Sequence, residues 1–367
     1  MSLDHDPPPH QFLGDIRVID LSQYVPGPYA TRQLADLGAD VIKIEPPQGD
    51  PMRKFMHVGD QAVSPVYRHL NRGKRVALLD LKADSGRQIL MDLLTDADVL
   101  LESYRPGVLQ RLGFGRDILE DINPGLIHCA LSGYGQTGPY RLRAGHDLNY
   151  CAATGQLSGS GTAEMPIMSF PPIADHAGAM QASITILAAL HARERSNKGA
   201  FLDISLFETA LSWQYVPLLQ DNAGRAEYVI NGGAACYNIY QCQDQEFISL
   251  GAIETHFWQH FCEAVDRPHW IDRQYETMPQ KALISELSDL IAQHPLVYWN
   301  ELLASVDCCY EPVILSKQLS SHVQIDSRHA LGNNGPAYPG WINHAPVTID
   351  EDYVEIQNNE SIRWQTG

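Results

Sequence analysis

The sequence predicts an α/β protein, with an open parallel sheet in a large domain and a smaller α+β domain. Three observations predict this fold. Short β-branched runs alternate with helical patterns over the first 200 residues, the chain begins with a strand–helix–strand unit, and its character changes near Gly232. A length of 367 residues fits about two domains. We expect a large domain over residues 1–228, a small domain over 229–320, and a C-terminal segment, 321–367, that returns to the large domain.

The first unit is the clearest. Ile16–Leu21 is a β-branched run typical of a buried strand, and Asp40–Glu45 is a second such run. Between them, Pro26–Gly38 has helical apolar spacing, with Pro28 near its start and Gly38 at its end, as helices prefer. A strand–helix–strand unit predicts parallel strands joined by a right-handed crossover.

The same alternation continues along the chain. Ser205 and Glu208 form a capping box that predicts the start of a long helix. Further strands are expected at Arg75–Leu81, Ala97–Glu102, Leu126–Leu131, Phe201–Ser205 and Phe247–Leu250, and further helices at Ser85–Leu94, Met180–Arg195, Glu254–Val265 and Ala282–Ala292.

Composition excludes several classes of protein. Hydrophobic residues make up 44% and charged residues 19%, which is typical of a globular chain. The 26 Lys and Arg residues against 44 Asp and Glu give a formal net charge of −18, which argues against nucleic acid or a membrane surface as a partner. No apolar run approaches 18 residues, so we expect no membrane span. A small anionic ligand needs only a few local basic groups and stays possible.

The cysteines and the N-terminus indicate a cytoplasmic protein. The seven cysteines include no CxxC pair, which predicts free thiols in a reducing compartment and no metal site. Residues 1–11 are polar and rich in proline, unlike a signal peptide.

A glycine-rich loop follows the strand at Leu126–Leu131. Gly133, Gly135 and Gly138 match G-x-G-x-x-G, the dinucleotide-binding pattern. However, Pro139 follows directly and no helical pattern succeeds it, and the match is not in the first strand–helix unit. The alternative is a loop that lets the backbone approach a neighbouring group closely. Gly133 and Gly135 are therefore candidates for contact with a bound ligand.

Four residues could carry acid–base chemistry. His146 stands beside Asp147 just after the glycine-rich loop, Asp175 precedes an apolar helix, and Glu254 follows a strand. A histidine suits proton transfer near neutral pH. Each residue also has an ordinary explanation, since Asp147 and Asp175 could be helix N-caps and Glu254 an acid at a helix start.

Basic residues gather at predicted strand ends and turns, where open α/β sheets bind ligands. Such a set suits phosphate groups, although a solvated surface is the alternative. Its members are Arg72, Lys74, Arg75, Lys82, Arg105 and Arg111.

Taken in order, these segments resemble the family III CoA-transferases (the CaiB/BaiF family), and most closely their alpha-methylacyl-CoA racemase branch. The resemblance covers about residues 13–315, and its most specific part is the loop that runs into Gly145-His146-Asp147-Leu148-Asn149-Tyr150. The other segments that carry it are Arg17–Glu45, Asn71–Lys82, Ala97–Gly113, Ser132–Tyr150, Gly232–Tyr240 and Gly251–Glu254.

The resemblance implies a Rossmann-like large domain with a smaller domain, and a homodimer whose subunits interlock like linked rings. It also implies a CoA thioester as substrate and no cofactor beyond its CoA moiety. It implies that His146 and Asp175 form an acid–base pair, that Glu254 hydrogen-bonds the histidine, and that Arg111 is the arginine of the RLG motif. A backbone N–H near Asp147 is our candidate donor to the enolate. In transferases of the family the catalytic aspartate falls at Asp147.

Within the family, four features favour a racemase that acts on a 2-methylacyl-CoA. His146 precedes Asp147, Asp175 and Glu254 are present, and the chain is shorter than typical transferases. Two departures are Pro46-Pro47, where many members have a basic residue, and Gln241, where relatives often have an acid. The alternatives are a CoA-transferase that uses Asp147 covalently, a non-catalytic acyl-CoA binder, and a nicotinamide enzyme based on the glycine-rich loop.

Overall fold

The computed structural model describes residues 11–56, 62–220, 225–347 and 351–365. The chain divides into two compact units, which are described separately. Unit 1 comprises Met1–Cys151, Pro172–Ser212 and Ser320–Gly367, and unit 2 comprises Ala152–Pro171 and Trp213–Leu319. The sequence predicted that the chain leaves the large domain after residue 228 and returns to it at residue 321, whereas in the structure it first enters unit 2 at Ala152 and last returns to unit 1 at Ser320. Residues 1–10, on which the absence of a signal peptide was argued, lie outside the described part of the chain.

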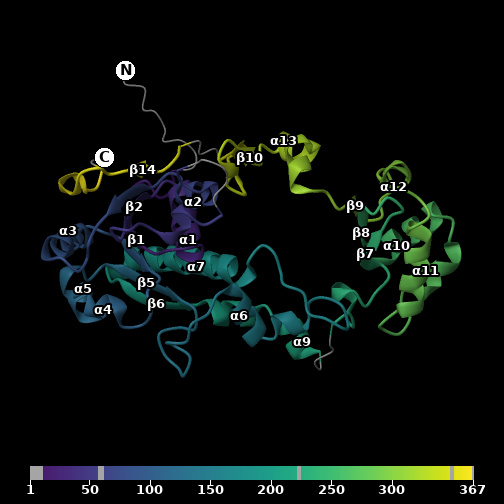
Figure 1. Ribbon diagram of the computed structural model, residues 1–367, viewed down its shortest axis with the longest axis horizontal. Coiled ribbons are helices and arrows are strands. Elements are labelled where there is room, and N and C mark those ends of the chain that lie inside the picture. The colour runs from purple at the N-terminus through teal and green to yellow at the C-terminus, as the bar shows by residue number, and fades with distance from the viewer. Residues whose placement is uncertain (1–10, 57–61, 221–224, 348–350, 366–367) are drawn as a thin grey trace, which may run out of the picture. The chain divides into compact units, whose positions relative to one another are not determined.

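Unit 1 is built on a seven-stranded sheet in the order β14-β3-β2-β1-β4-β5-β6, and every pairing is parallel (Figure 1). The six strands from β3 to β6 follow the doubly wound order, in which the chain changes direction across the sheet between β1 and β4. The strands are β1 (Arg17–Leu21), β2 (Asp40–Glu45), β3 (Arg75–Leu78), β4 (Val99–Glu102), β5 (Ile127–Ser132), β6 (Ala200–Ser205) and β14 (Val354–Glu355).

Helices cover both faces of this sheet. On one face α1 packs against α7, and α7 also packs against β5 and β6. On the other face, α3, α4 and α5 contribute Leu90, Leu109 and Leu119 to a core with the strands. The helices of unit 1 are α1 (Pro26–Asp36), α2 (Pro65–Asn71), α3 (Asp84–Thr95), α4 (Val108–Arg111), α5 (Arg116–Ile122), α7 (Ile173–Ser196), α8 (Leu206–Ser212) and α13 (Val323–Ser327), and α6 (Asp147–Ala153) crosses into unit 2.

Two helix predictions need correction. The predicted long helix after Ser205 ends at Ser212, although the Ser205 hydroxyl does accept the Glu208 N–H at 3.2 Å. The helix expected from Met180 begins earlier, at Ile173. Within the described residues α7 is the one helix whose length and apolar composition would allow a membrane span, a test that core helices also pass. Its packing on α1, α8, β5 and β6 is that of a core helix.

The C-terminal segment closes the far edge of the unit 1 sheet. Val354 and Glu355 pair with Arg75 and Val76, which makes β14 the edge strand. The Trp364 indole donates to the Leu93 carbonyl at 3.1 Å, which fixes the segment against α3. Before it lie two short antiparallel hairpins, β10 (Leu331–Gly332) with β11 (Gly335–Pro336) and β12 (Trp341–Ile342) with β13 (Ala345–Pro346).

Unit 2 has an antiparallel sheet in the order β7-β8-β9 and a core of its own around Trp258, Phe261 and Trp299. Its elements are α9 (Tyr215–Leu219), β7 (Tyr237–Gln241), β8 (Phe247–Gly251), α10 (Thr255–Ala264), α11 (Lys281–Ile291), α12 (Leu296–Leu303) and β9 (Tyr310–Pro312). The sequence predicted β8, α10 and α11 but not β7 or β9.

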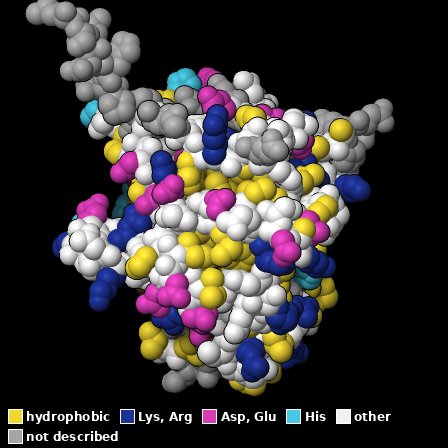
Figure 2. All heavy atoms as spheres, turned by 90° about the vertical axis from the view of Figure 1, so that its left-hand side faces the viewer, with side chains coloured by type: hydrophobic (Ala, Val, Ile, Leu, Met, Phe, Trp, Pro, Cys, Tyr) yellow, Lys and Arg dark blue, Asp and Glu magenta, His cyan; other side chains and the backbone are white. Residues whose placement is uncertain are grey.

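Charged and hydrophobic side chains are mixed on one side of unit 1 (Figure 2). On the side of unit 1 that carries α3 and α5, acidic and basic side chains are interspersed around patches of hydrophobic ones (Figure 2). All seven cysteines are free thiols, and Cys309 is the exposed one.

Candidate active site

A cavity of about 250 Å³ opens in unit 1 at the carboxyl ends of β1, β4 and β5. Strands β1 and β4 are neighbours at the point where the strand order reverses, which is where open α/β sheets bind their ligands. Residues from three parts of the fold meet there: the turns after the strands, the loop over residues 133–146, and the first turn of α7. They include Gln23, Tyr24, Ser103, Tyr104, Arg105, Ser132, Gly133, Tyr134, Arg141, Arg143, His146, Tyr150 and Asp175.

His146 is the last residue before α6 and lines this cavity. Its backbone is fixed on both sides by Asn149, whose N–H donates to the His146 carbonyl at 2.8 Å and whose Oδ1 accepts the His146 N–H at 3.0 Å. The exposed imidazole faces the edge of the Tyr24 ring, with 6.2 Å between ring centroids. The helix start thus presents an accessible imidazole to the cavity.

Asp175 lines the same cavity from the first turn of α7. It is not the N-cap, a position that Pro172 occupies. Burial, together with the nearby charge of Asp147, raises the pKa of Asp175 to about 7. This carboxyl group can therefore accept or donate a proton near neutral pH.

Asp147 follows His146 but does not line the cavity. Its Oδ1 accepts the backbone N–H of Asp175 at 3.1 Å, and its Oδ2 accepts the thiol of Cys151 at 3.7 Å. Asp147 is the first residue of α6, so its side chain caps the start of α7 instead of its own helix.

Two glycines of the loop lie too close to an aromatic ring for either position to carry a side chain. A Cβ on Gly133 would lie 2.4 Å from the Tyr150 hydroxyl oxygen, and one on Gly145 would lie 2.7 Å from the same ring. Gly135 has φ +82°, which favours glycine. No helix begins directly after Gly138, so the dinucleotide reading of this loop lacks its structural context, although Gly133 does line the cavity.

Three of the six predicted phosphate ligands are committed elsewhere. Lys74 is buried and donates to Asp20 at 3.1 Å, and Arg72 is buried and donates to Asp36 at 2.9 Å. Arg75 forms a two-oxygen ion pair with Asp40 at the amino end of β3, on the opposite edge of the sheet. These assignments are corrected, because a side chain that neutralises a buried or adjacent carboxylate is not available to a ligand.

The other three basic residues are exposed, and Arg105 is the one that lines the cavity. Lys82 follows β3 by four residues and Arg111 ends α4, so neither contributes to the cavity wall.

Two cavity arginines were missed by sequence reasoning. Arg141 and Arg143 line the cavity from the loop before His146, and Arg143 stacks on the Tyr140 ring at 4.6 Å. Within the described residues neither has an acidic side chain at ion-pair distance, and the same holds for Arg105. Their position between the glycine-rich loop and His146 was the signal that could have found them.

The remaining predicted residue, Glu254, belongs to unit 2, where it is the exposed N-cap of α10. The cavity therefore brings His146, Asp175, Arg105 and Gly133 together but does not include Glu254. Among the described residues no group of three His, Cys, Asp or Glu side chains could hold a metal ion.

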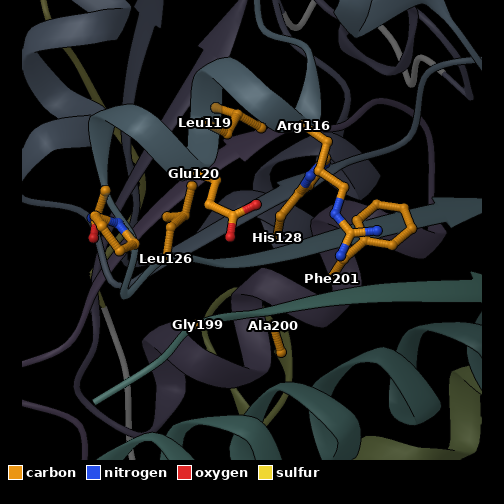
Figure 3. Close-up of a pocket in the computed structure, with 10 residues that line it drawn as sticks. Arg116, Leu119, Glu120, Leu126, His128, Gly199, Ala200 and Phe201 are labelled. Carbon is orange, nitrogen blue, oxygen red and sulfur yellow. The ribbon is translucent and has the colours of Figure 1, made fainter.

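A second, smaller cavity of about 90 Å³ lies at the opposite edge of the sheet, by the amino ends of β5 and β6 (Figure 3). Arg116 stacks on Phe201 at 5.3 Å, and both ring nitrogens of His128 are buried without a hydrogen-bond partner within the described structure. A polar cavity of this size has room for ordered water. None of the predicted site residues lines it.

Comparison with known proteins identifies the family of the chain. The sequence model that describes CoA-transferase family III matches residues 13–351 of the chain. The chain belongs to CoA-transferase family III. The chain is 32% identical over 320 residues to alpha-methylacyl-CoA racemase from Homo sapiens, covering 84% of this chain and 80% of that protein. It is 31% identical over 332 residues to acetyl-CoA:oxalate CoA-transferase from Acetobacter aceti, covering 87% and 85%.

Family III members of known structure share the fold. A crystal structure of Rv3272 from M. tuberculosis superimposes with a TM-score of 0.81 at 27% identity, covering 96% of this chain and 99% of that one. The parallel α/β sheet predicted from the sequence is thus confirmed. The chain is a member of an enzyme family that acts on acyl-CoA, whose members include both racemases and CoA-transferases.

Proposed function

We propose that this protein is an acyl-CoA racemase or epimerase that moves the α-proton of a 2-methylacyl-CoA thioester. The observation that carries the proposal is that His146 and Asp175, from two different elements, line one cavity at the ligand-binding edge of the sheet. Inversion at a carbon needs two proton-transfer groups, one for each face. A histidine and a carboxyl group that titrates near pH 7 can fill both roles.

In the proposed reaction the imidazole of His146 takes the α-proton. The C–H electron pair becomes the C=C bond of an enolate, and the carbonyl π pair moves to the thioester oxygen. The carboxyl group of Asp175 then gives its proton to the other face of the α-carbon, and the enolate electrons return to re-form the thioester. The opposite enantiomer reacts by the reverse sequence, and no other reactant is consumed.

The cavity arginines support recognition of an anionic ligand. Arg105, Arg141 and Arg143 gather at one cavity in a chain whose formal net charge is −18. Guanidinium groups suit the phosphates of CoA. We propose that they bind the CoA moiety and that the protein is an interlocked homodimer, as its family resemblance implies. We also propose that it works in the cytoplasm, because its cysteines are free thiols.

A CoA-transferase that uses Asp147 as a nucleophile is the second candidate, and the 31% identity to an acetyl-CoA:oxalate CoA-transferase favours it. Against it, both Asp147 oxygens accept hydrogen bonds and the residue does not line the cavity.

One experiment separates the two. The purified protein is incubated in heavy water with (2R)- or (2S)-2-methylacyl-CoA, with and without free carboxylic acids. Deuterium at the α-carbon and loss of optical purity without an acceptor acid support the racemase. New acyl-CoA that forms only when an acid is added, without exchange, supports transfer.

A further inference from the structure

The carboxylate of Asp147 joins the starts of two helices. Its Oδ1 accepts the Asp175 N–H in the first turn of α7, at 3.1 Å. Its Oδ2 accepts the Cys151 thiol one turn along α6, at 3.7 Å. The first N–H groups of a helix lack partners within the helix, so the Asp147 carboxylate satisfies one of these groups in α7.

We propose that Asp147 is a positioning residue, whose carboxylate fixes Asp175 beside the cavity and favours the acid form of its carboxyl group. The inference rests on the proposed racemase function and assigns one of its two directions to this form of the site. For the enantiomer that reacts with the acid form of Asp175, the α-proton leaves to His146 and Asp175 supplies the proton that completes inversion.

The two hydrogen bonds to Asp147 fix the position of its carboxylate relative to Asp175. Donors from two helices hold Asp147, so its negative charge stays next to Asp175. The backbone hydrogen bond acts on the peptide N–H of Asp175 and leaves its carboxyl group to face the cavity. A carboxylate held beside a second carboxyl group disfavours ionisation of that group.

The other groups around Asp175 are consistent with this role. From α6, the Tyr150 hydroxyl donates to the Gly145 carbonyl at 2.7 Å, and burial raises the pKa of the Cys151 thiol to about 11. On α7, Nδ1 of the neighbouring His176 ring forms a hydrogen bond with the Pro172 carbonyl at 2.6 Å. The charged or titratable groups that share the cavity with Asp175 are Arg105, Arg141, Arg143, His146, Tyr24, Tyr104, Tyr134 and Tyr150.

The arginines in that set favour the ionised form of Asp175. Nevertheless, burial and Asp147 prevail, and the pKa of Asp175 lies at about 7. Removing the Asp147 charge should therefore move the balance toward the ionised form.

Asp147→Asn tests the charge, because asparagine keeps a carbonyl oxygen for the Asp175 N–H and nearly the same shape. The carboxyl group of Asp175 is titrated in ¹³C-aspartate-labelled protein and assigned by its loss in Asp175→Asn. We expect the Asp147→Asn change to lower the titration midpoint of Asp175 by about one pH unit. The pH profile of α-proton exchange should shift in the same direction, with exchange retained.

Two control variants sharpen the test. Asp117→Asn removes an exposed acid from the first turn of α5 and should leave the midpoint unchanged. Asp147→Ala removes both the charge and the hydrogen bond, and should lower the midpoint and also reduce kcat by displacing Asp175.

An unchanged midpoint in Asp147→Asn would overturn the inference, and so would complete loss of exchange at every pH in a folded variant, because Asp147 would then react directly. The proposed function fails differently. In that case Asp175→Asn and His146→Ala, each made in the otherwise unaltered protein, would leave interconversion of the two enantiomers intact, whatever the midpoint of Asp175 in the unaltered protein.

Discussion

Gly133 lies directly against the ring of Tyr150, and a Cβ at Gly133 would come within 2.4 Å of the tyrosine oxygen and 2.7 Å of the carbon that bears it. Tyr150 also donates to the Gly145 carbonyl at 2.7 Å, so the ring holds both ends of the loop that precedes His146. We expect Gly133→Ala to lower the free energy of unfolding by about 1–3 kcal/mol, because the ring cannot move without losing this hydrogen bond.

Urea unfolding measures this effect. Gly14→Ala is the matched control, since a Cβ there meets nothing closer than 3.7 Å and should change stability far less. Equal stabilities for the two variants would show that the loop accommodates a side chain.

The Lys74–Asp20 pair predicts a structural role where the sequence predicted a phosphate contact. Both side chains are fully buried. Burial alone would raise the pKa of Asp20, but Lys74 and Lys43 reverse this effect and hold the pKa below its ordinary value. Lys74→Met leaves Asp20 without its nearest cation and should cost about 3–5 kcal/mol of stability. Lys82→Met, at an exposed site, should leave unfolding unchanged, and equal losses in both variants would contradict this account.

The cavity arginines should control affinity for the anionic part of the substrate. Arg141→Ala and Arg143→Ala remove cations that face the cavity from the loop. We expect each to raise KM for acyl-CoA about tenfold, with kcat less affected, since charge-assisted hydrogen bonds contribute about 1.5–3 kcal/mol. The effect should shrink as salt rises. Arg87→Ala, on the surface of α3, serves as the control, and a KM equal to that of this control would exclude the assignment.

Asp175 should make stability depend on pH. Its pKa rises from 3.8 to about 7 on folding, so the folded state holds the proton more tightly. The stability from this group is complete below about pH 4 and is lost as pH rises through 7. Asp175→Asn removes that loss and should stabilise the protein at pH 8 by about 1–2 kcal/mol, the half-buried position limiting the effect. Urea unfolding at pH 5 and pH 8 measures this, and an equal effect at both pH values would contradict it.

Much of the fold could be predicted from local patterns. Strand β2 matches its predicted bounds, and β1 and α1 differ by one or two residues, because each is a short apolar run between clear turn signals. Strand β14 was missed because its two residues carry little pattern, and their pairing with β3 depends on contacts 279 residues away in the chain. The assignment of residues 152–171 to unit 2 was also missed, because no change of composition marks the point where the chain crosses between the units.

The site, too, contains residues that could be found from the sequence and contacts that could not. His146 and Asp175 could be found from motif context, and the structure brings them to one cavity. Arg72 and Lys74 looked equally suitable in the sequence, but their partners Asp36 and Asp20 lie 36 and 54 residues away, beyond the reach of local patterns. The hydrogen bond from Asp175 to Asp147 is likewise a tertiary contact, visible only once α6 and α7 are folded together.

The central claim is that His146 and Asp175 serve opposite faces of one α-carbon. The direct measurement is α-proton exchange in heavy water on each pure enantiomer with His146→Ala and Asp175→Asn, and with His191→Ala, on the exposed part of α7, as the control. The account predicts that each variant loses interconversion of the enantiomers yet still exchanges one of them, and that the two variants retain opposite enantiomers. Racemisation at the control rate in either variant, or exchange of the same enantiomer by both, would contradict it.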